Sequence, residues 1–268
     1  MEFDIISSLV TYRNDPVLLK KTVESFLTNK LRTRLFIIDN SNTDALRKVF
    51  ANSRAEYIFN NRNIGFGRAH NQCMARNLAA TKYHLVLNPD VVLAPRTLEK
   101  LFFFMESNPD VGMVMPKVLD DKNQVQFLCK RLPDPLNLMI RRFGFPFVRR
   151  ISGKRLSRYE MREKDYNASF EAPYFSGCFM FIRAEALKKV GLFDERFFMY
   201  MEDTDISRRI HEHYRTVYYP EAHIVHSHAR DSYQINRLLL THIVSAIKYF
   251  NKWGWFFDRS RTTINRSL

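Results

Sequence analysis

The stretch His84-Leu85-Val86-Leu87-Asn88-Pro89-Asp90 points most directly to the fold class of this chain. Its apolar run predicts a short buried strand, and Asp90 places a carboxylate just beyond the end of that strand. In open α/β sheets, ligands bind in the crevice outside the carboxyl ends of the strands. A single Asp at such a place is more often a turn residue or a helix cap, so a functional interpretation needs support from other parts of the chain.

Two later stretches supply that support. Phe198-Met199-Tyr200-Met201-Glu202-Asp203-Thr204-Asp205 places three carboxylates in four positions behind an apolar and aromatic run. Ile224-Val225-His226-Ser227-His228 ends another apolar run on imidazoles. A carboxylate, a carboxylate cluster and a histidine are the groups that a metal-assisted transfer site requires.

Elsewhere, apolar runs alternate with helical patterns, which predicts an α/β fold with a Rossmann-like, mostly parallel central sheet flanked by helices. The predicted strands are residues 4–10, 35–38, 56–59, 84–87, 111–118, 179–182, 216–219 and 223–225. The predicted helices are residues 16–27, 65–81, 95–107, 184–190 and 204–212. Polar residues at four strand ends would line one edge of the sheet, namely Thr11, Asp39, Asn60 and Asp90. Residues 130–172 have weak periodicity and many arginines and prolines, which predicts a mobile insertion rather than a core element.

Composition and charge exclude several classes of protein. Hydrophobic residues make up 46% of the 268 residues, which is too many for a disordered chain. Cysteines occur only at positions 73, 129 and 178, which argues against a disulfide scaffold and for a reducing compartment. Acidic residues precede the first apolar run, unlike in a signal peptide, and no run approaches the ~20 apolar residues of a membrane-spanning helix. The net charge of +14 is concentrated in residues 130–164 (11 Lys/Arg against 3 Asp/Glu) and 229–268 (7 against 2), which suggests an anionic surface or substrate.

Residues 231–268 are predicted to form a helical extension of a domain that spans residues 1–230. Apolar residues share one face of the predicted helix 232–252, namely Ile235, Leu239, Ile243, Ala246 and Phe250. Trp253 and Trp255 follow, with lysines and arginines nearby, which predicts an amphipathic segment that lies on a membrane surface. A helix packed on the first domain is an alternative that the sequence leaves open.

Seven short motifs carry a resemblance to a known family. In chain order they are Leu9-Val10-Thr11-Tyr12-Arg13-Asn14, Ile37-Ile38-Asp39-Asn40-Ser41, Asn63-Ile64-Gly65-Phe66-Gly67, Leu87-Asn88-Pro89-Asp90, Phe175-Ser176-Gly177-Cys178, Glu202-Asp203-Thr204-Asp205 and the segment around His226. With these motifs the chain resembles the inverting glycosyltransferases of family 2, which have the GT-A fold. More narrowly, it resembles the bacterial rhamnosyltransferases that build O-antigen and related cell-wall glycans.

The resemblance implies a nucleotide-sugar donor at the strand ends. The implied donor-binding residues are Thr11, Tyr12, Arg13, Asp39, Asn63, Gly65, Phe66, Gly67, Asn88 and Asp90. Asp39 would accept a hydrogen bond from the base, and it also fits an Asx turn. The two glycines would permit a tight backbone at a helix start, where free N–H groups favour phosphate; a simple helix-entry turn is the alternative.

The resemblance also implies a divalent metal ion, Mn²⁺ or Mg²⁺, because Asp90 matches the last carboxylate of the family's Asp-X-Asp motif. The ion would neutralise the diphosphate leaving group. His226 matches the family's late histidine and would complete the site, with His228 as the rival ligand. Asn88 replaces the first Asp of the motif, which often contacts ribose hydroxyls, so a thymidine donor without a 2′-hydroxyl is compatible with this sequence.

Asp203 matches the family's catalytic base, which takes the proton of the acceptor hydroxyl as that hydroxyl attacks the anomeric carbon. Glu202 would bind acceptor hydroxyls or raise the pKa of the base by like-charge repulsion. Ser176-Gly177-Cys178 would lie on the acceptor side. The alternative for the carboxylate cluster is an acidic first helical turn favoured by the helix dipole, which explains Asp205 better than Asp203.

Together these implications predict transfer of L-rhamnose from dTDP-β-L-rhamnose to a polyprenyl-diphosphate-linked saccharide, at the cytoplasmic side of the bacterial inner membrane. The protein would be peripheral, with its basic segments facing the acceptor diphosphate and anionic lipid. The same fold with a UDP-galactose, UDP-glucose or UDP-N-acetylhexosamine donor is the first alternative. A nucleic-acid-binding protein is less favoured, because the surplus arginines lie outside the strand-end crevice and form no known base-reading motif.

Overall fold

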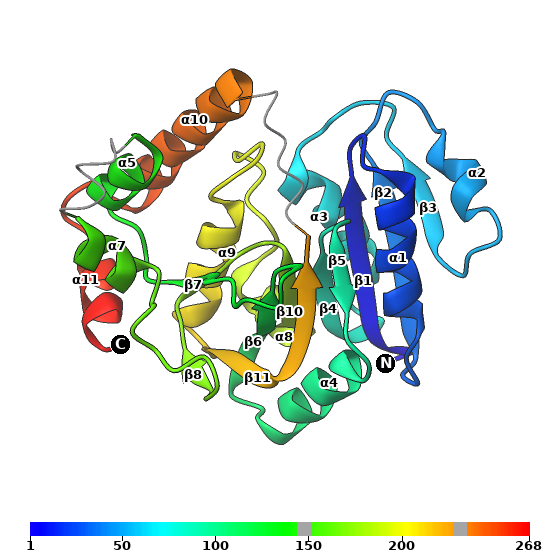
Figure 1. Ribbon diagram of the computed structural model, residues 1–268, viewed down its shortest axis with the longest axis horizontal. Helices are drawn as coiled ribbons and strands as arrows, with labels where there is room; N and C mark the ends of the chain where they lie inside the picture. Colours follow the sequence, from blue (N-terminus) through cyan, green and yellow to red (C-terminus); the bar gives the residue numbers. More distant parts are fainter. Residues whose placement is uncertain (144–151, 228–234) are drawn as a thin grey trace.

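The computed structural model describes residues 1–143, 152–227 and 235–268, and it has one large β-sheet with helices on both faces (Figure 1). The strands are β1 (Phe3–Thr11), β2 (Thr33–Asp39), β3 (Glu56–Phe59), β4 (Thr81–Leu87), β5 (Val91–Leu93), β6 (Val111–Leu119), β7 (Cys129–Lys130), β8 (Phe170–Glu171), β9 (Tyr174–Phe175), β10 (Phe179–Arg183) and β11 (Arg215–His226). The helices are α1 (Pro16–Leu27), α2 (Leu46–Phe50), α3 (Phe66–Asn77), α4 (Thr97–Ser107), α5 (Pro135–Phe143), α7 (Gly153–Tyr159), α8 (Ala184–Val190), α9 (Glu202–His211), α10 (Ile235–Trp253) and α11 (Arg259–Arg266). The predicted α/β class with flanking helices is confirmed.

The large sheet has the strand order β3-β2-β1-β4-β10-β6-β11-β5, with β8 paired to β11. Strands β3, β2, β1 and β4 are parallel, as the alternation of strands and helices predicts. Strand β10 is antiparallel to both of its neighbours, β4 and β6, and β11 is parallel to β6. The carboxyl ends of β1, β2 and β4 therefore meet at one edge of the sheet, where α/β folds bind ligands.

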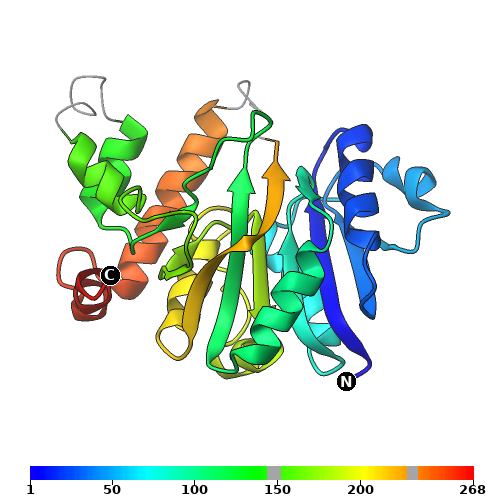
Figure 2. The same cartoon turned by 60° about the horizontal axis from the view of Figure 1, so that its bottom comes forward.

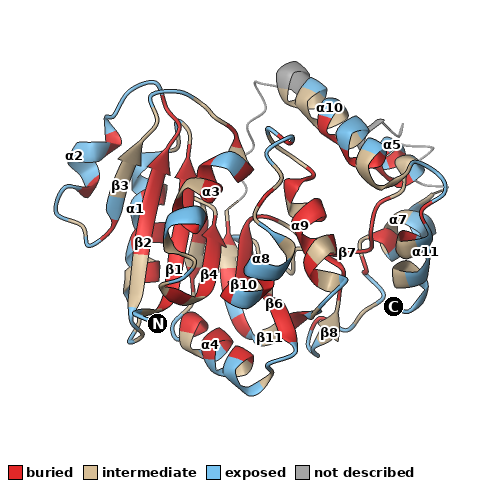
Figure 3. Cartoon of the chain, turned by 180° about the vertical axis from the view of Figure 1, so that it is seen from behind, coloured by how far each residue is buried: buried red, intermediate tan, exposed pale blue. Residues whose placement is uncertain are grey.

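Helices cover both faces of the central strands, so those strands are buried along most of their length. β1 is buried from Asp4 to Thr11, and Figure 3 shows the same burial across β2, β4 and β10. The adjoining helix α1 begins after Asp15, whose side chain accepts a hydrogen bond from the Val17 N–H at 2.7 Å, with Pro16 at the first helical position. Local capping and burial thus set where β1 ends and α1 begins.

Two predictions about the second half of the chain are wrong. Residues 215–226 form one strand with an irregular register between Tyr219 and His223, because its pairing with β6 and β5 continues across Pro220. Within 130–172, the described residues form β7, α5, α7 and β8 and bury Tyr159, Met161 and Tyr166, so this segment contributes to the core. Its aromatic contacts join residues far apart in sequence, such as Tyr166 with Tyr218, and leave no periodic pattern. Residues 144–151 lie outside the described part of the chain.

The C-terminal helix α10 packs on the rest of the molecule next to α9 and α5 (Figures 1 and 2). Tyr249 and Phe250 are buried against Tyr159, Phe197 and Met201. Of the predicted apolar face, Ala246 and Phe250 belong to this contact. Exposed apolar residues of α10 fall on another face, namely Leu240, Val244 and Ile247.

Polar contacts fix the same segment to α9. The Trp253 indole N–H donates to Asp205 Oδ1 at 2.8 Å, and Lys252 forms an ion pair with the same oxygen at 2.7 Å. Asp258 accepts two hydrogen bonds from the Arg208 guanidinium, at 2.6 and 2.8 Å.

In the described ranges, no helix combines the length and the apolarity that crossing a bilayer demands.

Candidate active site

Six of the residues predicted for donor binding line one pocket of about 150 Å³ at the carboxyl ends of β1 and β4. The lining residues are Val10, Thr11, Tyr12, Asn14, Asn40, Asn63, Gly65, Phe66, Asn88, Pro89, Phe198 and Met199. The other four predicted residues, Arg13, Asp39, Gly67 and Asp90, lie outside this lining. The structure therefore brings the strand-end motifs together into one pocket, which we call the donor-side pocket.

A network of side-chain amides shapes the entry to α3 beside this pocket. The Asn40 amide donates to Gly65 O at 3.2 Å and accepts from the Asn60 amide at 2.9 Å. Asn63 Oδ1 accepts the Gly65 N–H at 3.0 Å. Asn40 belongs to the motif Ile37-Ile38-Asp39-Asn40-Ser41, but the sequence analysis did not predict it as a site residue. Its position directly after Asp39, at the end of the strand, would have indicated it.

Gly65 is required at the start of α3. Its φ of +95° is unfavourable for residues with a side chain, and a Cβ there would lie 2.5 Å from Phe198 O. The next N–H, of Phe66, donates to the same carbonyl at 2.9 Å. One of the helix-start N–H groups predicted to favour phosphate is thus bound to the 198–201 loop, and Gly67 packs against Phe193.

Asp39 forms the Asx turn that the sequence offered as one interpretation. Its Oδ1 accepts the Ser41 N–H at 2.8 Å, and its Oδ2 accepts the Tyr57 hydroxyl at 2.5 Å. Burial and the contact with Asp39 raise the pKa of Tyr57. Ser41 in turn accepts the N–H of Arg13, whose guanidinium lies 5.2 Å from the centroid of the Tyr12 ring. Both carboxylate oxygens of Asp39 therefore have protein partners in the described chain.

Asp90 and His226 lie together, as predicted for metal ligands. His226 pairs with Val91 across β11 and β5, and its Nε2 lies 3.5 Å from Asp90 Oδ1. Gln126 Oε1 lies 3.1 Å from the other imidazole nitrogen and orients the ring. Asp90 Oδ1 is buried and has no hydrogen-bond partner in the described chain. A buried carboxylate oxygen facing an imidazole nitrogen fits a divalent cation, with the remaining ligands coming from outside these two side chains.

The described ranges contain no cluster of three or more His, Cys, Asp or Glu side chains that would enclose a metal alone. A cation at Asp90 and His226 would therefore depend on the donor diphosphate, on water or on residues outside these ranges for its other ligands. The rival ligand, His228, lies outside the described residues.

Asp203 is the second residue of α9 and is held by donors on both of its oxygens. Oδ2 accepts the Gly177 N–H at 3.0 Å and the Tyr174 hydroxyl at 3.3 Å, and Oδ1 accepts the Thr204 N–H at 2.7 Å. A Cβ at Gly177 would lie 3.3 Å from Asp203 Cβ, so glycine allows this close approach. These contacts fix the orientation of the carboxylate.

Glu202 differs from its neighbour. It is buried, its Oε2 has no hydrogen-bond partner among the described residues, and it does not line the pocket onto which Asp203 opens. Burial and the nearby Asp203 charge raise the pKa of Glu202 to about 8. The like-charge repulsion predicted for this pair is present, and it is Glu202 whose pKa is raised.

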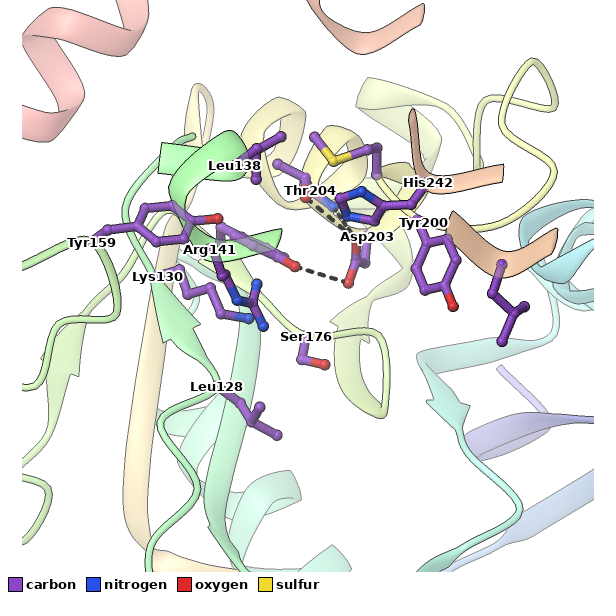
Figure 4. Close-up of a pocket in the computed structure, with 13 residues that line it drawn as sticks. Leu128, Lys130, Leu138, Arg141, Tyr159, Ser176, Tyr200, Asp203, Thr204 and His242 are labelled. Atoms are coloured by element: carbon purple, nitrogen blue, oxygen red, sulfur yellow. Dashed lines mark hydrogen bonds between the residues drawn. The ribbon is translucent and has the colours of Figure 1, made fainter. Parts of the chain in front are cut away.

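Asp203 opens onto a second pocket of about 450 Å³, which we call the acceptor-side pocket (Figure 4). Its lining residues are Leu128, Lys130, Leu138, Arg141, Tyr159, Tyr174, Ser176, Tyr200, Met201, Asp203, Thr204, Leu238 and His242. Of the residues predicted for this side, Ser176 lines the pocket, Gly177 binds Asp203, and Cys178 is buried, which raises the pKa of its thiol to about 12.

Sequence reasoning missed Lys130 and Arg141, because it assigned their segment to a mobile insertion. A lysine directly after Leu128-Cys129, and before Leu132, was the available signal, since a charged residue in an apolar run is seldom buried without a function.

The 198–201 loop separates the two pockets. Phe198 and Met199 line the donor-side pocket, and Tyr200 and Met201 line the acceptor-side pocket. Tyr200 and Met201 both have φ near +70°, a strained conformation for residues with side chains. Met199 O accepts the Ser245 hydroxyl of α10 at 2.8 Å, so the C-terminal helix supports this loop. Asp203 is thus the second residue after a loop shared by both pockets.

Comparison with known proteins shows the family to which the chain belongs. Residues 7–191 match the model of glycosyl transferase family 2. The chain is 25% identical to the N-acetylglucosaminyl-diphospho-decaprenol L-rhamnosyltransferase of Mycobacterium tuberculosis, over 97% of this chain and 88% of that protein. It is 22% identical to a rhamnosyltransferase of Escherichia coli K12, over 86% of this chain and 87% of that protein.

Solved structures share the fold. A mannosyltransferase from Pyrobaculum calidifontis in complex with GDP-Man and Mn²⁺ superposes with a TM-score of 0.59 at 17% identity, over 92% of this chain and 65% of that one. GalNAc-T7 with UDP, GalNAc and Mn²⁺ gives a TM-score of 0.62 at 15% identity; this chain spans less than half, 45%, of its length. The two-pocket α/β domain described above is therefore a GT-A fold, and the chain belongs to glycosyl transferase family 2.

Proposed function

We propose that this glycosyltransferase transfers L-rhamnose from dTDP-β-L-rhamnose, with inversion, to a polyprenyl-diphosphate-linked saccharide. The proposal rests chiefly on Asp203, an oriented carboxylate that opens onto a large pocket beside the donor-side pocket. The rhamnosyltransferase relative from M. tuberculosis, which spans nearly the whole chain, supports this donor sugar and this class of acceptor.

In this mechanism, Asp203 accepts the proton of an acceptor hydroxyl. The hydroxyl oxygen forms a bond to the anomeric carbon while the bond from that carbon to the diphosphate oxygen breaks. dTDP leaves from the face opposite the acceptor, so the β-linked sugar becomes α-linked. Asp90 and His226 would hold Mn²⁺ or Mg²⁺, which would neutralise the charge that develops on the leaving diphosphate.

A donor screen tests the proposal. The purified protein would be incubated with N-acetylglucosaminyl-diphosphate on a short prenyl chain, Mn²⁺, and either dTDP-β-L-rhamnose or a UDP-hexose, and the product linkage would be read by NMR. We expect α-rhamnoside from the dTDP donor. Preferred use of a UDP-hexose would establish the alternative donor, and a β-linked product would contradict inversion. In a separate thermal melt, a higher melting temperature with an oligonucleotide and no metal would favour nucleic-acid binding.

We also propose that the protein is peripheral to an anionic membrane, through the face of α10 that carries Leu240, Val244 and Ile247. These side chains are 63%, 48% and 41% exposed and are spaced to share one helix face. The double variant Leu240→Gln/Val244→Gln should float less with phosphatidylglycerol vesicles than the wild type. Val49→Gln on α2, at the far end of the molecule in Figure 1, is the matched control because its side chain is 43% exposed. Equal flotation of the wild type and the double variant would contradict this face as the membrane contact.

A further inference from the structure

Two cations of the basic segment face Asp203 across the acceptor-side pocket. Lys130 comes from β7 and Arg141 from α5. In Figure 4 the charged ends of both side chains lie together on one side of the pocket, with Ser176 and Asp203 facing them. Among the lining residues Asp203 is the only carboxylate, so the described pocket lining carries a cationic excess.

Lys130 occupies an energetically costly position. Its side chain is 3% exposed, and it forms no salt bridge with any residue in the described ranges. Its ammonium lies 4.9 Å from the centroid of the Tyr174 ring. Burial, and then the charge of Arg141, lower the pKa of Lys130 to about 8. An ammonium removed from water without a counter-ion destabilises the protein, unless an anionic ligand enters the pocket.

Arg141 has a carboxylate partner, Glu160, which also contacts Arg162. Arg141 lies 3.7 Å from Glu160 Oε1, and the other oxygen of Glu160 contacts Arg162 at 2.8 Å. Arg141 also lines the pocket, and the fork geometry of a guanidinium suits phosphate.

The cationic excess of the pocket lining favours an acceptor that carries its own negative charge close to the reacting sugar.

We propose that Lys130 and Arg141 bind the phosphate attached to the reducing end of the acceptor sugar, while a hydroxyl of the same sugar reaches Asp203. This inference rests on the proposed function, and it narrows the acceptor to a sugar joined directly to diphosphate. The donor diphosphate is the other source of the same chemistry, and the experiment separates the two.

The test compares two acceptors that differ only in phosphate: N-acetylglucosaminyl-diphosphate on a short prenyl chain, and a phosphate-free alkyl N-acetylglucosaminide. Lys130→Met should lower the ratio of kcat/KM for the first over the second by about 10- to 100-fold, because a charge-assisted hydrogen bond is lost. Lys130→Arg should retain most of the ratio. Lys154→Met, an exposed lysine of the same basic segment, should leave the ratio unchanged.

Two further measurements separate binding from folding and from donor contacts. The melting temperature of Lys130→Met should equal or exceed that of the wild type, because an unpaired buried charge has been removed. The Kd of dTDP with Mn²⁺ should be unchanged. Inorganic diphosphate, titrated calorimetrically in the absence of metal, should bind the wild type and bind Lys130→Met about 10-fold more weakly.

An unchanged acceptor ratio in Lys130→Met would overturn the inference, and weakened dTDP binding would assign Lys130 to the donor instead. If the wild type used neither acceptor, the proposed function would fail, and the diphosphate titration would still decide the site. Diphosphate affinity that is unchanged in Lys130→Met would then overturn it, whereas binding weakened about 10-fold in that variant would support it.

Discussion

The ion pair between Arg208 and Asp258 connects α9, the helix that carries Asp203, to the start of α11, so breaking it measures how firmly the C-terminal segment is docked. Both side chains are almost fully buried, at 1% and 3% exposure, and two hydrogen bonds join them. The guanidinium also stacks on Trp253, 3.9 Å from its ring, and contacts Glu212 at 3.3 Å. We predict that Asp258→Ala destabilises the whole catalytic domain.

The magnitude follows from the burial of Arg208. Removing one partner of a buried pair leaves an uncompensated charge and costs about 3–5 kcal/mol. Asp258 also caps α11 by accepting the Arg261 N–H at 2.9 Å, and the loss of a cap adds about 1 kcal/mol. Because Glu212 and Trp253 retain part of the compensation for Arg208, we expect a loss of about 3 kcal/mol in the free energy of unfolding. That loss corresponds to a melting temperature about 5 °C lower for a chain of this size.

Urea denaturation followed by tryptophan fluorescence measures this loss, since Trp253 lies in the contact. The matched control is Asp44→Ala, which breaks the Arg47–Asp44 pair, whose side chains are 56% and 55% exposed. That variant should change the unfolding free energy by less than about 1 kcal/mol. A loss for Asp258→Ala as small as that of the control would refute the reasoning and would mean that the C-terminal segment is not docked through α9.

Four further predictions test the site. Asp203→Asn should lower kcat by about two to four decades while dTDP binding, measured by thermal shift, stays constant; loss of dTDP binding would remove Asp203 from the role of base. Mn²⁺ should no longer tighten dTDP binding in Asp90→Ala, and it should tighten binding less in His226→Ala, as titration of dTDP with and without metal would reveal. Metal-dependent tightening that survives in Asp90→Ala would refute the coordination scheme. The KM of a diphosphate-linked acceptor should rise above about pH 8, where Lys130 loses its proton among Arg141, Asp203, Glu160 and Cys178, and a KM that is flat to pH 9 would contradict this. The folded protein keeps Glu202 protonated up to about pH 8, whereas Glu202 in the unfolded chain ionises near its usual pKa, so the free energy of unfolding should fall as pH rises from about 5 to 8. In a series of urea melts, Glu202→Gln should remove that fall. Identical pH profiles for the wild type and the variant would argue against a buried protonated Glu202.

Much of the donor side was predictable because its residues follow local rules. The stretch at residues 84–90 ends a buried strand and begins a turn, and the Asx turn at Asp39 and the glycine at position 65 depend on contacts within a few residues. Parallel strands joined by helices then place these ends at one edge of the sheet. Asp90 and His226 also lie close together, as the resemblance implied, because His226 ends β11 and pairs with Val91, the residue that follows Asp90.

The acceptor side was less predictable because its residues come from segments distant in sequence. Lys130, Arg141 and Asp203 share one pocket only through the pairing of β7 with β9 and the packing of α5 near α10. The family motifs do not include the two cations, and their segment has no hydrophobic period to follow.

The amino-acid sequence by itself determined the α/β class and the strand ends, since burial period and turn chemistry act over short stretches of chain, and the motifs at those strand ends carried the resemblance from which the donor-side residues and the role of Asp203 were predicted. The tertiary structure alone decided which face of α10 is packed and which is exposed, that burial beside Asp203 raises the pKa of Glu202, and that Lys130 and Arg141 share a pocket with Asp203. The physical reason is that burial, pKa and the encounter of charges depend on neighbours brought together by packing, and the sequence specifies those neighbours only through the completed fold.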